Sequence, residues 1–228
     1  ANAAFRSKID ELSFVTRVGE AISRHTSARE LSDELVEIIA ETTLSKHALL
    51  YRPSLNKRYE LQAASKMFGD RDFPVSFDVS VLPGNFTGKT GPVALLDLDA
   101  EEIDNSRWPF PPALRSWLII PLVARDTCHA LLMLADEEPG AISASRERTL
   151  SMVAPQLSSA FSNIKLYEDL KASEAKYRTF VERMQDAVYI CTPDLRIIDS
   201  NQAAIALYAR VEFWTDLKSL FANPETAA

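Results

Sequence analysis

One short loop of this chain has the composition of a phosphate-binding site. It reads Gly84-Asn85-Phe86-Thr87-Gly88-Lys89-Thr90. A phosphate-binding loop needs four residues between its glycines and a helix directly after it, because backbone N–H groups and the helix N-terminus hold the phosphate. Here three residues separate the glycines, Pro83 replaces a needed glycine, and Gly91-Pro92 follows in place of a helix. The sequence therefore predicts an ordinary loop at this position.

The residues that could bind a metal or act as nucleophiles are scattered along the chain. His25, His47 and His129 have no metal-ligand spacing with cysteines or carboxylates. Cys128 adjoins His129, but neighbouring strand residues point to opposite faces of a sheet. Cys128 and Cys191 lie far apart, which is typical of a reducing compartment and not of a disulfide scaffold. No order or spacing indicates a catalytic triad or dyad, so the sequence predicts no catalytic residue and no metal site.

Length and composition are typical of a globular chain with room for one full domain and a smaller unit. The chain has 228 residues, of which 46% are hydrophobic and 25% charged. A net charge of −7 without any concentration of Lys and Arg argues against nucleic-acid binding. No apolar run approaches the roughly 18–20 residues that cross a bilayer, and the chain does not begin like a signal peptide. We expect a cytoplasmic chain that makes no membrane contact, although a longer parent protein with a membrane anchor stays open.

Apolar spacing predicts two helices followed by strands. Spacings of three and four at 5–25 and 31–43 indicate one apolar stripe on each helix. Ser27 and Glu30 have the spacing of a capping box at the start of the second helix. Apolar runs then predict strands, which fall at 48–51, 59–63, 93–98, 117–124 and 130–135. The last two are joined by a tight turn at 125–127 and are apolar on both faces, as central strands of a covered sheet are.

A long helix is predicted over 143–186, with Pro155 introducing a kink or a broken hydrogen bond. Its apolar stripe is offset between Tyr167 and Tyr177. Two short strands and a helix from Asn201 complete the pattern. The predicted fold class is α+β, with a central antiparallel sheet, helices on one face and a long C-terminal linker helix. The second unit is predicted to be incomplete, because a hairpin with a short helix buries little surface.

Three stretches resemble GAF domains. The segment from Arg115-Ser116 to Pro121-Leu122, followed by a turn and an apolar strand led by Ala130, resembles the penultimate strand pair of that family. The family's closing helix ends in a pattern that here reads Ala160-Phe161-Ser162-Asn163-Ile164-Lys165-Leu166-Tyr167. Thr87-Gly88-Lys89 matches the family's lead into a strand. The resemblance covers roughly residues 27–170.

A further stretch, 172–187, resembles the lead-in helix of bacterial PAS domains. Eight later positions match the first half of that fold: Ile190, Asp194, Ile197, Asn201, Ala203, Ala204, Leu207 and Tyr208. Asn201 is expected to cap the following helix. The match ends near Phe221, before the strands that would close a PAS sheet. The resemblances imply an N-terminal signalling or dimerisation helix at 1–26, a GAF domain at 27–168, a helical linker at 169–186 and a truncated PAS domain at 187–228, from a bacterial multidomain sensor such as those of two-component systems.

The chain departs from the GAF branches whose activities are best defined. The motif of the cyclic-nucleotide branch would fall on Ala135, Asp136, Ile142, Arg146 and Glu147, of which only Glu147 matches. The bilin-binding branch needs a thiol in the pocket-side loops, and residues 68–112 contain none. The branch that reduces free methionine sulfoxide uses several cysteines, whereas this domain has only Cys128. The resemblance therefore implies a non-catalytic domain, for which we predict no cofactor.

The resemblance also implies a ligand pocket between the sheet and the loops at 68–112. The candidate pocket residues are Tyr51, Phe77, Phe86, Trp108, Arg115 and Trp117. The aromatic rings would line a small apolar or aromatic ligand, and Arg115 or Lys89 would offer a charge to an anion. Plain core packing and a surface salt bridge are the alternatives for these side chains. The residues expected on signalling or dimer helices are Ile9, Leu12, Val153, Leu157, Ile164 and Tyr167.

The function we expect is a sensory input module. Its GAF pocket would bind an unidentified small molecule, and its helices would relay the signal to the PAS unit and to output domains in the same protein. A homodimer through the terminal helices is part of this expectation. A ligand-free dimerisation or partner-binding module is one alternative, which a tightly filled pocket would favour. A small-molecule enzyme is the other, which an open pocket with paired titratable groups would favour.

Overall fold

The computed structural model describes residues 2–54, 57–66, 72–82, 93–95, 108–194 and 196–208. Its contacts divide the chain into two compact units, Ala1–Leu166 and Tyr167–Ala228. The first unit begins with two helices, α1 (Asn2–Arg24) and α2 (Ala28–Thr43). The helix α3 (Ala144–Arg183) runs from the first unit into the second.

A six-stranded antiparallel sheet forms the centre of the first unit, in the order β3-β2-β1-β6-β5-β4. The strands are β1 (His47–Pro53), β2 (Arg58–Ala64), β3 (Ser76–Asp78), β4 (Val93–Leu95), β5 (Ser116–Ala124) and β6 (Thr127–Asp136), and a 3₁₀ turn (Val79–Val81) follows β3. Arg125 and Asp126 connect β5 to β6 with φ of 50° and 59°, the left-handed values of a two-residue hairpin turn. The predicted strand pair and its tight turn are therefore confirmed. Of the strand predicted at 93–98, residues 93–95 form β4 and the rest lie outside the described residues.

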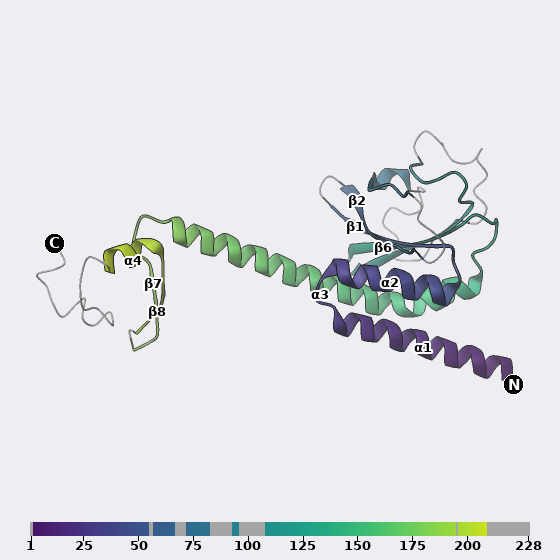
Figure 1. Cartoon of the computed structure of the whole chain (residues 1–228), viewed down its shortest axis with the longest axis horizontal. Coiled ribbons are helices and arrows are strands. Elements are labelled where there is room, and N and C mark those ends of the chain that lie inside the picture. Colours follow the sequence, from purple (N-terminus) through teal and green to yellow (C-terminus); the bar gives the residue numbers. More distant parts are fainter. Residues whose placement is uncertain are drawn as a thin grey trace, which may run out of the picture. The chain divides into compact units, whose positions relative to one another are not determined.

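The helices cover one face of this sheet (Figure 1). Successive strand residues point to opposite faces. Leu118, Ile120 and Leu132 therefore join the core under the helices, whereas Trp117 and Ile119 join a second core on the other face. Because both faces are buried, β5 is apolar over 117–124 and β6 is apolar over 130–135.

The helix starts differ from the prediction in one respect. Ser27 precedes α2 in an extended conformation but makes no side-chain capping hydrogen bond, so the predicted capping box is wrong. Glu30 instead places a carboxylate oxygen 3.7 Å from Nδ1 of His25. The helix α3 continues through Pro155, whose ring nitrogen has no hydrogen to donate to the carbonyl four residues earlier.

The second unit contains the end of α3, the hairpin of β7 (Tyr189–Cys191) and β8 (Ile197–Ser200), and the helix α4 (Gln202–Tyr208). Oδ1 of Asn201 accepts a hydrogen bond from the backbone N–H of Ala204 at 2.9 Å, which confirms the predicted helix cap. Among the described residues, no helix is both long and apolar enough to cross a membrane.

Candidate functional site

A group of aromatic rings packs on the sheet face opposite the helices. This aromatic cluster consists of Tyr51, Tyr59, Phe77, Trp108, Phe110 and Trp117. The ring centroids of Tyr51 and Phe77 are 4.8 Å apart, and those of Phe77 and Phe110 are 5.2 Å apart. Trp117 lies 4.8 Å from Phe110 and 5.5 Å from Trp108. Most of these pairs meet edge to face or tilted, which is the favourable geometry for aromatic rings.

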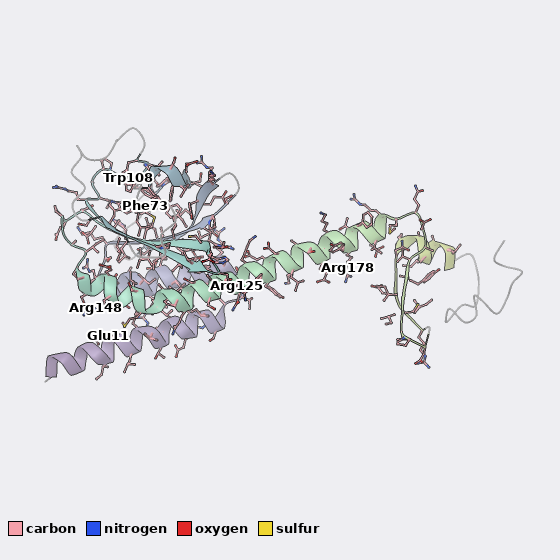
Figure 2. The ribbon with its side chains drawn as sticks, turned by 180° about the vertical axis from the view of Figure 1, so that it is seen from behind. Glu11, Phe73, Trp108, Arg125, Arg148 and Arg178 are labelled. Atoms are coloured by element: carbon pink, nitrogen blue, oxygen red, sulfur yellow. The ribbon has the colours of Figure 1, made fainter. Side chains whose placement is uncertain are left out.

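Four of the predicted pocket residues, Tyr51, Phe77, Trp108 and Trp117, lie together in the aromatic cluster. Figure 2 shows Trp108, with Phe73 nearby, on the side of the sheet away from the helices. Phe86 and Lys89 lie outside the described residues. Arg115 stands just before β5 and is not among the residues of this second core; its backbone N–H donates to the carbonyl of Asp136 at 2.9 Å.

Sequence reasoning did not identify Tyr59 or Phe110 as part of the site. Phe110 lies in the loops at 68–112, and an aromatic residue between Pro109 and Pro111 is an apolar signal within them. It is almost fully buried. Tyr59 is one of two buried residues of β2, and its ring stacks on Phe77.

The polar atoms of the cluster fix the segments that cover the sheet. Oη of Tyr51 donates to the carbonyl oxygen of Pro74 at 2.9 Å. Nε1 of Trp117 donates to the carbonyl oxygen of Leu114 at 3.0 Å. These bonds tie residues 72–82 and 108–114 to β1 and β5, so the rings and the segments above them form one packed layer.

Burial favours the neutral form of three titratable groups described on this face, Tyr51, Tyr59 and Cys128. Burial raises the pKa of Tyr51 and of Tyr59 well above the usual value of 10. Burial also raises the pKa of the Cys128 thiol, which donates to the carbonyl oxygen of Ala130 at 3.3 Å. Since the thiolate and not the thiol is the nucleophile, Cys128 is a poor candidate for covalent chemistry.

The corner between α1 and α2 holds an ionic group of three side chains, His25, Arg24 and Glu34. Nε2 of His25 lies 2.5 Å from Oε2 of Glu34, and Nη1 of Arg24 lies 2.6 Å from Oε1 of the same carboxylate. Burial raises the pKa of Glu34, but the hydrogen bond from His25 and the charge of Arg24 outweigh it, and the pKa falls below 4.5. These contacts connect the end of α1 and the following His25 to α2. Within the described residues, no three His, Cys, Asp or Glu side chains are placed to hold a metal ion.

The residues predicted for the signalling or dimer helices divide into two groups. Ile9, Leu12 and Tyr167 are exposed. Val153, Leu157 and Ile164 are instead buried in the core between α3 and the sheet of this chain. The sheet and helices of this chain already cover these three side chains, and the role predicted for the dimer helices stays a prediction.

The exposed apolar residues of α3 lie on a different side of the helix. They are Leu166, Leu170, Tyr177 and Phe180. Leu166 lies two positions after Ile164, which is a rotation of about 200° around an α-helix. The apolar stripe of α3 therefore moves to nearly the opposite side of the helix at this point. The sequence predicts this offset between Tyr167 and Tyr177, whereas the change from buried to exposed residues lies at Ile164 and Leu166, just before that interval.

The comparisons with known proteins place this fold in a family. The family model of the GAF domain matches residues 27–161, which is more than half of the chain. No relative among curated proteins matches the chain.

Solved structures agree with the fold. The GAF domain of an Acinetobacter phosphoenolpyruvate-protein phosphotransferase is 20% identical with a TM-score of 0.55, over 70% of this chain and 97% of that one. The GAF domain of a putative sensor histidine kinase from Pseudomonas syringae pv. tomato is 18% identical with a TM-score of 0.54, over 75% and 99%. A free methionine-R-sulfoxide reductase from Neisseria meningitidis is 14% identical with a TM-score of 0.58, over 69% and 91%. The chain therefore belongs to the GAF domain family, whose members are small-molecule-binding sensory modules of signalling proteins.

Proposed function

We propose that this chain is a non-catalytic sensory input module that binds a small apolar or aromatic molecule at the aromatic cluster. The observation that carries the proposal is the position of that cluster. Six rings lie on the one sheet face that the helices leave free, and two of them hold the covering segments by hydrogen bonds. A ligand that enters this layer displaces or reorients rings that are fastened to the sheet and to the cover at once.

Similar proteins that were solved with a bound small molecule support the proposal. Two solved GAF domains with 13% identity and a TM-score of 0.57 are from a cyanobacterial phytochrome, one bound to phycocyanobilin and one to phycoerythrobilin. The Neisseria reductase was solved with its substrate. Covalent attachment of a chromophore at residues 68–112 is not part of the proposal, because the chain has no cysteine there.

The proposed relay runs along α3. Leu150, Val153 and Leu157 bury one face of α3 against the sheet, so a shift of the sheet acts on the helix directly. The exposed apolar residues Leu166 and Leu170 then pack against the same residues of a second subunit, together with Ile9 and Leu12 of α1. This arrangement makes the protein a homodimer whose helix packing has two states that a ligand biases.

The rest of the proposal concerns the parent protein. The second unit is the first part of a PAS domain, and it passes the signal to output domains of a bacterial two-component or related system. The chain acts in the cytoplasm, and neither nucleic acid nor a membrane is among its partners.

A ligand-free dimerisation module is the second candidate. It is favoured by the complete burial of Tyr51 and Trp117, whose polar atoms are already bonded to backbone carbonyls. An enzymatic role has no such support, because burial favours the neutral form of Tyr51 and Cys128 on this face.

Two measurements separate these candidates. Native mass spectrometry of the purified chain is expected to detect a non-covalent small molecule that is lost on denaturation. The fluorescent probe anilinonaphthalene sulfonate is expected to bind the emptied protein and to change the emission of Trp108 and Trp117. Binding should weaken in Phe110→Ala and not in the exposed control Leu207→Ala. A chain that retains no ligand and does not bind the probe while folded would leave the ligand-free module as the better description.

A further inference from the structure

One buried side chain joins the end of α3 to the hairpin and the helix that follow it. Asn201 lies between β8 and α4 and is 1% exposed. Its Nδ2 donates to the carbonyl oxygens of Val181 at 3.0 Å and Asp186 at 2.9 Å. Its Oδ1 accepts from the backbone N–H groups of Val188 and Ala204, each at 2.9 Å. Both N–H donors and both lone pairs of this amide are thus used on four backbone groups from different segments.

Two further bonds reinforce the same point. The backbone N–H of Asn201 donates to the carbonyl oxygen of Val188 at 3.1 Å. The carboxylate of Glu182 accepts from the backbone N–H of Gln202 at 3.0 Å. The start of α4 is therefore bonded to the last turn of α3 and also to the residue that leads into β7.

Apolar packing between α3 and the hairpin is much less complete. A cleft of about 240 Å³ lies between them, lined by Tyr177, Val181, Val188 and Ile190 among others. Tyr177 and Ile190 remain 68% and 54% exposed. In this part of the chain the hydrogen bonds of Asn201 therefore fasten the hairpin to α3 more tightly than side-chain packing does.

We propose that Asn201 is a positioning residue that couples the last turn of α3 to β7, β8 and α4. A displacement of α3 is then carried into the hairpin and is not absorbed by the connection at 184–188. The two halves of the amide have separate tasks: Nδ2 holds the end of α3 and the connection, and Oδ1 holds the lead into β7 and the start of α4. The inference rests on the proposed relay through α3, but the coupling itself is measurable without any ligand.

The substitution Asn201→Asp tests this division, because Asp has the same shape and keeps the acceptor while it loses both donors. At neutral pH its second oxygen faces two carbonyl oxygens. In the full chain, amide hydrogen exchange at 183–187 is expected to become at least about tenfold faster. The variant loses buried hydrogen bonds and gains repulsion between oxygens, and together these raise the equilibrium constant for local opening by more than about tenfold. The amide of Ala204 should stay protected, because Asp caps a helix as well as Asn does. Asn163→Asp, at an exposed position on α3, is the matched control and should change neither.

A direct readout of coupling uses two spin labels, at Lys176 on α3 and at Asp194 in the β7–β8 turn, in a chain whose two cysteines are serine. The distribution of distances between the labels should broaden in Asn201→Asp and not in Asn163→Asp. An unchanged distribution together with unchanged exchange at 183–187 would overturn the proposal, whatever the protein is found to bind.

A measurement on the unmodified chain covers the case in which Asn201→Asp does not fold. The amides of Val188 and Ala204 share one acceptor atom, so they should open together and exchange with the same free energy. If the protection factors of these two amides differ by more than about tenfold, the two segments open separately. That result would contradict the proposal that Asn201 couples them.

Discussion

Two leucines on α3 allow the assignment of its two apolar faces to be tested with the same substitution at each position. Leu157 is fully buried in the core under the sheet, whereas Leu170 is 65% exposed. Leu157→Ala removes a packed side chain and leaves a cavity, which costs about 3 kcal/mol within the usual range of 2–5. For Leu170→Ala only about a third of a side chain worth roughly 2 kcal/mol is withdrawn from water, and alanine is the better helix former. The expected loss is therefore about 0.5 kcal/mol or less.

The assay is urea unfolding followed by tryptophan fluorescence, with the free energy of unfolding extrapolated to water. Repeating it at low and high protein concentration separates folding from association, because a partner that binds only the folded chain raises the apparent stability by mass action. In the unmodified chain the midpoint should rise with concentration. Leu170→Ala should abolish that rise, and Leu157→Ala should lower stability at both concentrations. Equal losses for the two variants in dilute protein would refute the assignment of Leu157 to the core and Leu170 to the surface.

Three further perturbations follow from contacts in the first unit. Trp117→Phe leaves the carbonyl of Leu114 without its side-chain donor and removes buried volume. In the same urea assay it should lower the free energy of unfolding by about 2 kcal/mol. Trp108→Phe, at a half-buried site, should lower it less. Glu34→Gln should lower the free energy of unfolding by about 0.5 kcal/mol at neutral pH. Because the pKa of Glu34 is lowered in the fold, the difference in stability between the variant and the unmodified chain should vanish as pH falls below 4.5. A difference that grows in acid would contradict the ionic group at that corner. The raised pKa values of Tyr51 and Tyr59 mean that the fold keeps their protons, so stability should decline as pH rises above 10. A spectroscopic titration should accordingly find these two tyrosines ionising only on unfolding, and Tyr51→Phe should remove one of them.

The sequence predicts most of the fold because the buried faces of helices and strands show a regular spacing of apolar residues. The runs 117–124 in β5 and 130–135 in β6 are apolar at every position, which is typical of strands covered on both faces. The capping box at Ser27 fails for a different reason. Its residue types fit the local motif, but Glu30 lies by His25, and contacts between α1 and α2 outweigh a local preference of about 1 kcal/mol.

The candidate site is harder to predict, because a periodic stripe does not say which surface it meets. Val153 and Leu157 show the spacing of three and four that any buried helix face shows, whether their own sheet or a second subunit covers it. Phe110 lies in a segment whose prolines and charges predict a loop, and only the packed structure places its ring between Phe77 and Trp117. By contrast, the cap at Asn201 was predictable, because its acceptor lies three residues from its donor in the same chain segment. Its bonds to Val181 and Asp186 connect groups 20 and 15 residues away, and no local pattern records them.

The fastening of α3 restricts how the proposed relay can work. Three residues on one face, Leu150, Val153 and Leu157, hold the first half of α3 to the sheet, and the amide of Asn201 holds its last turn. Between these points the helix is continuous, so unfolding a part of it would cost the hydrogen bonds of at least a turn. A rigid rotation or shift breaks none of them, and rotation is the motion that exchanges which side of α3 faces a partner. Because the stripe of Leu166 and Leu170 lies nearly opposite the buried stripe, a small turn of the helix changes the packing of the exposed stripe while the core contacts adjust by rotamer changes. The proposed signal is therefore a rotation of α3, and cysteine crosslinking along residues 166–180 should shift from one helix face to another when ligand binds, with an unchanged crosslinking pattern refuting it.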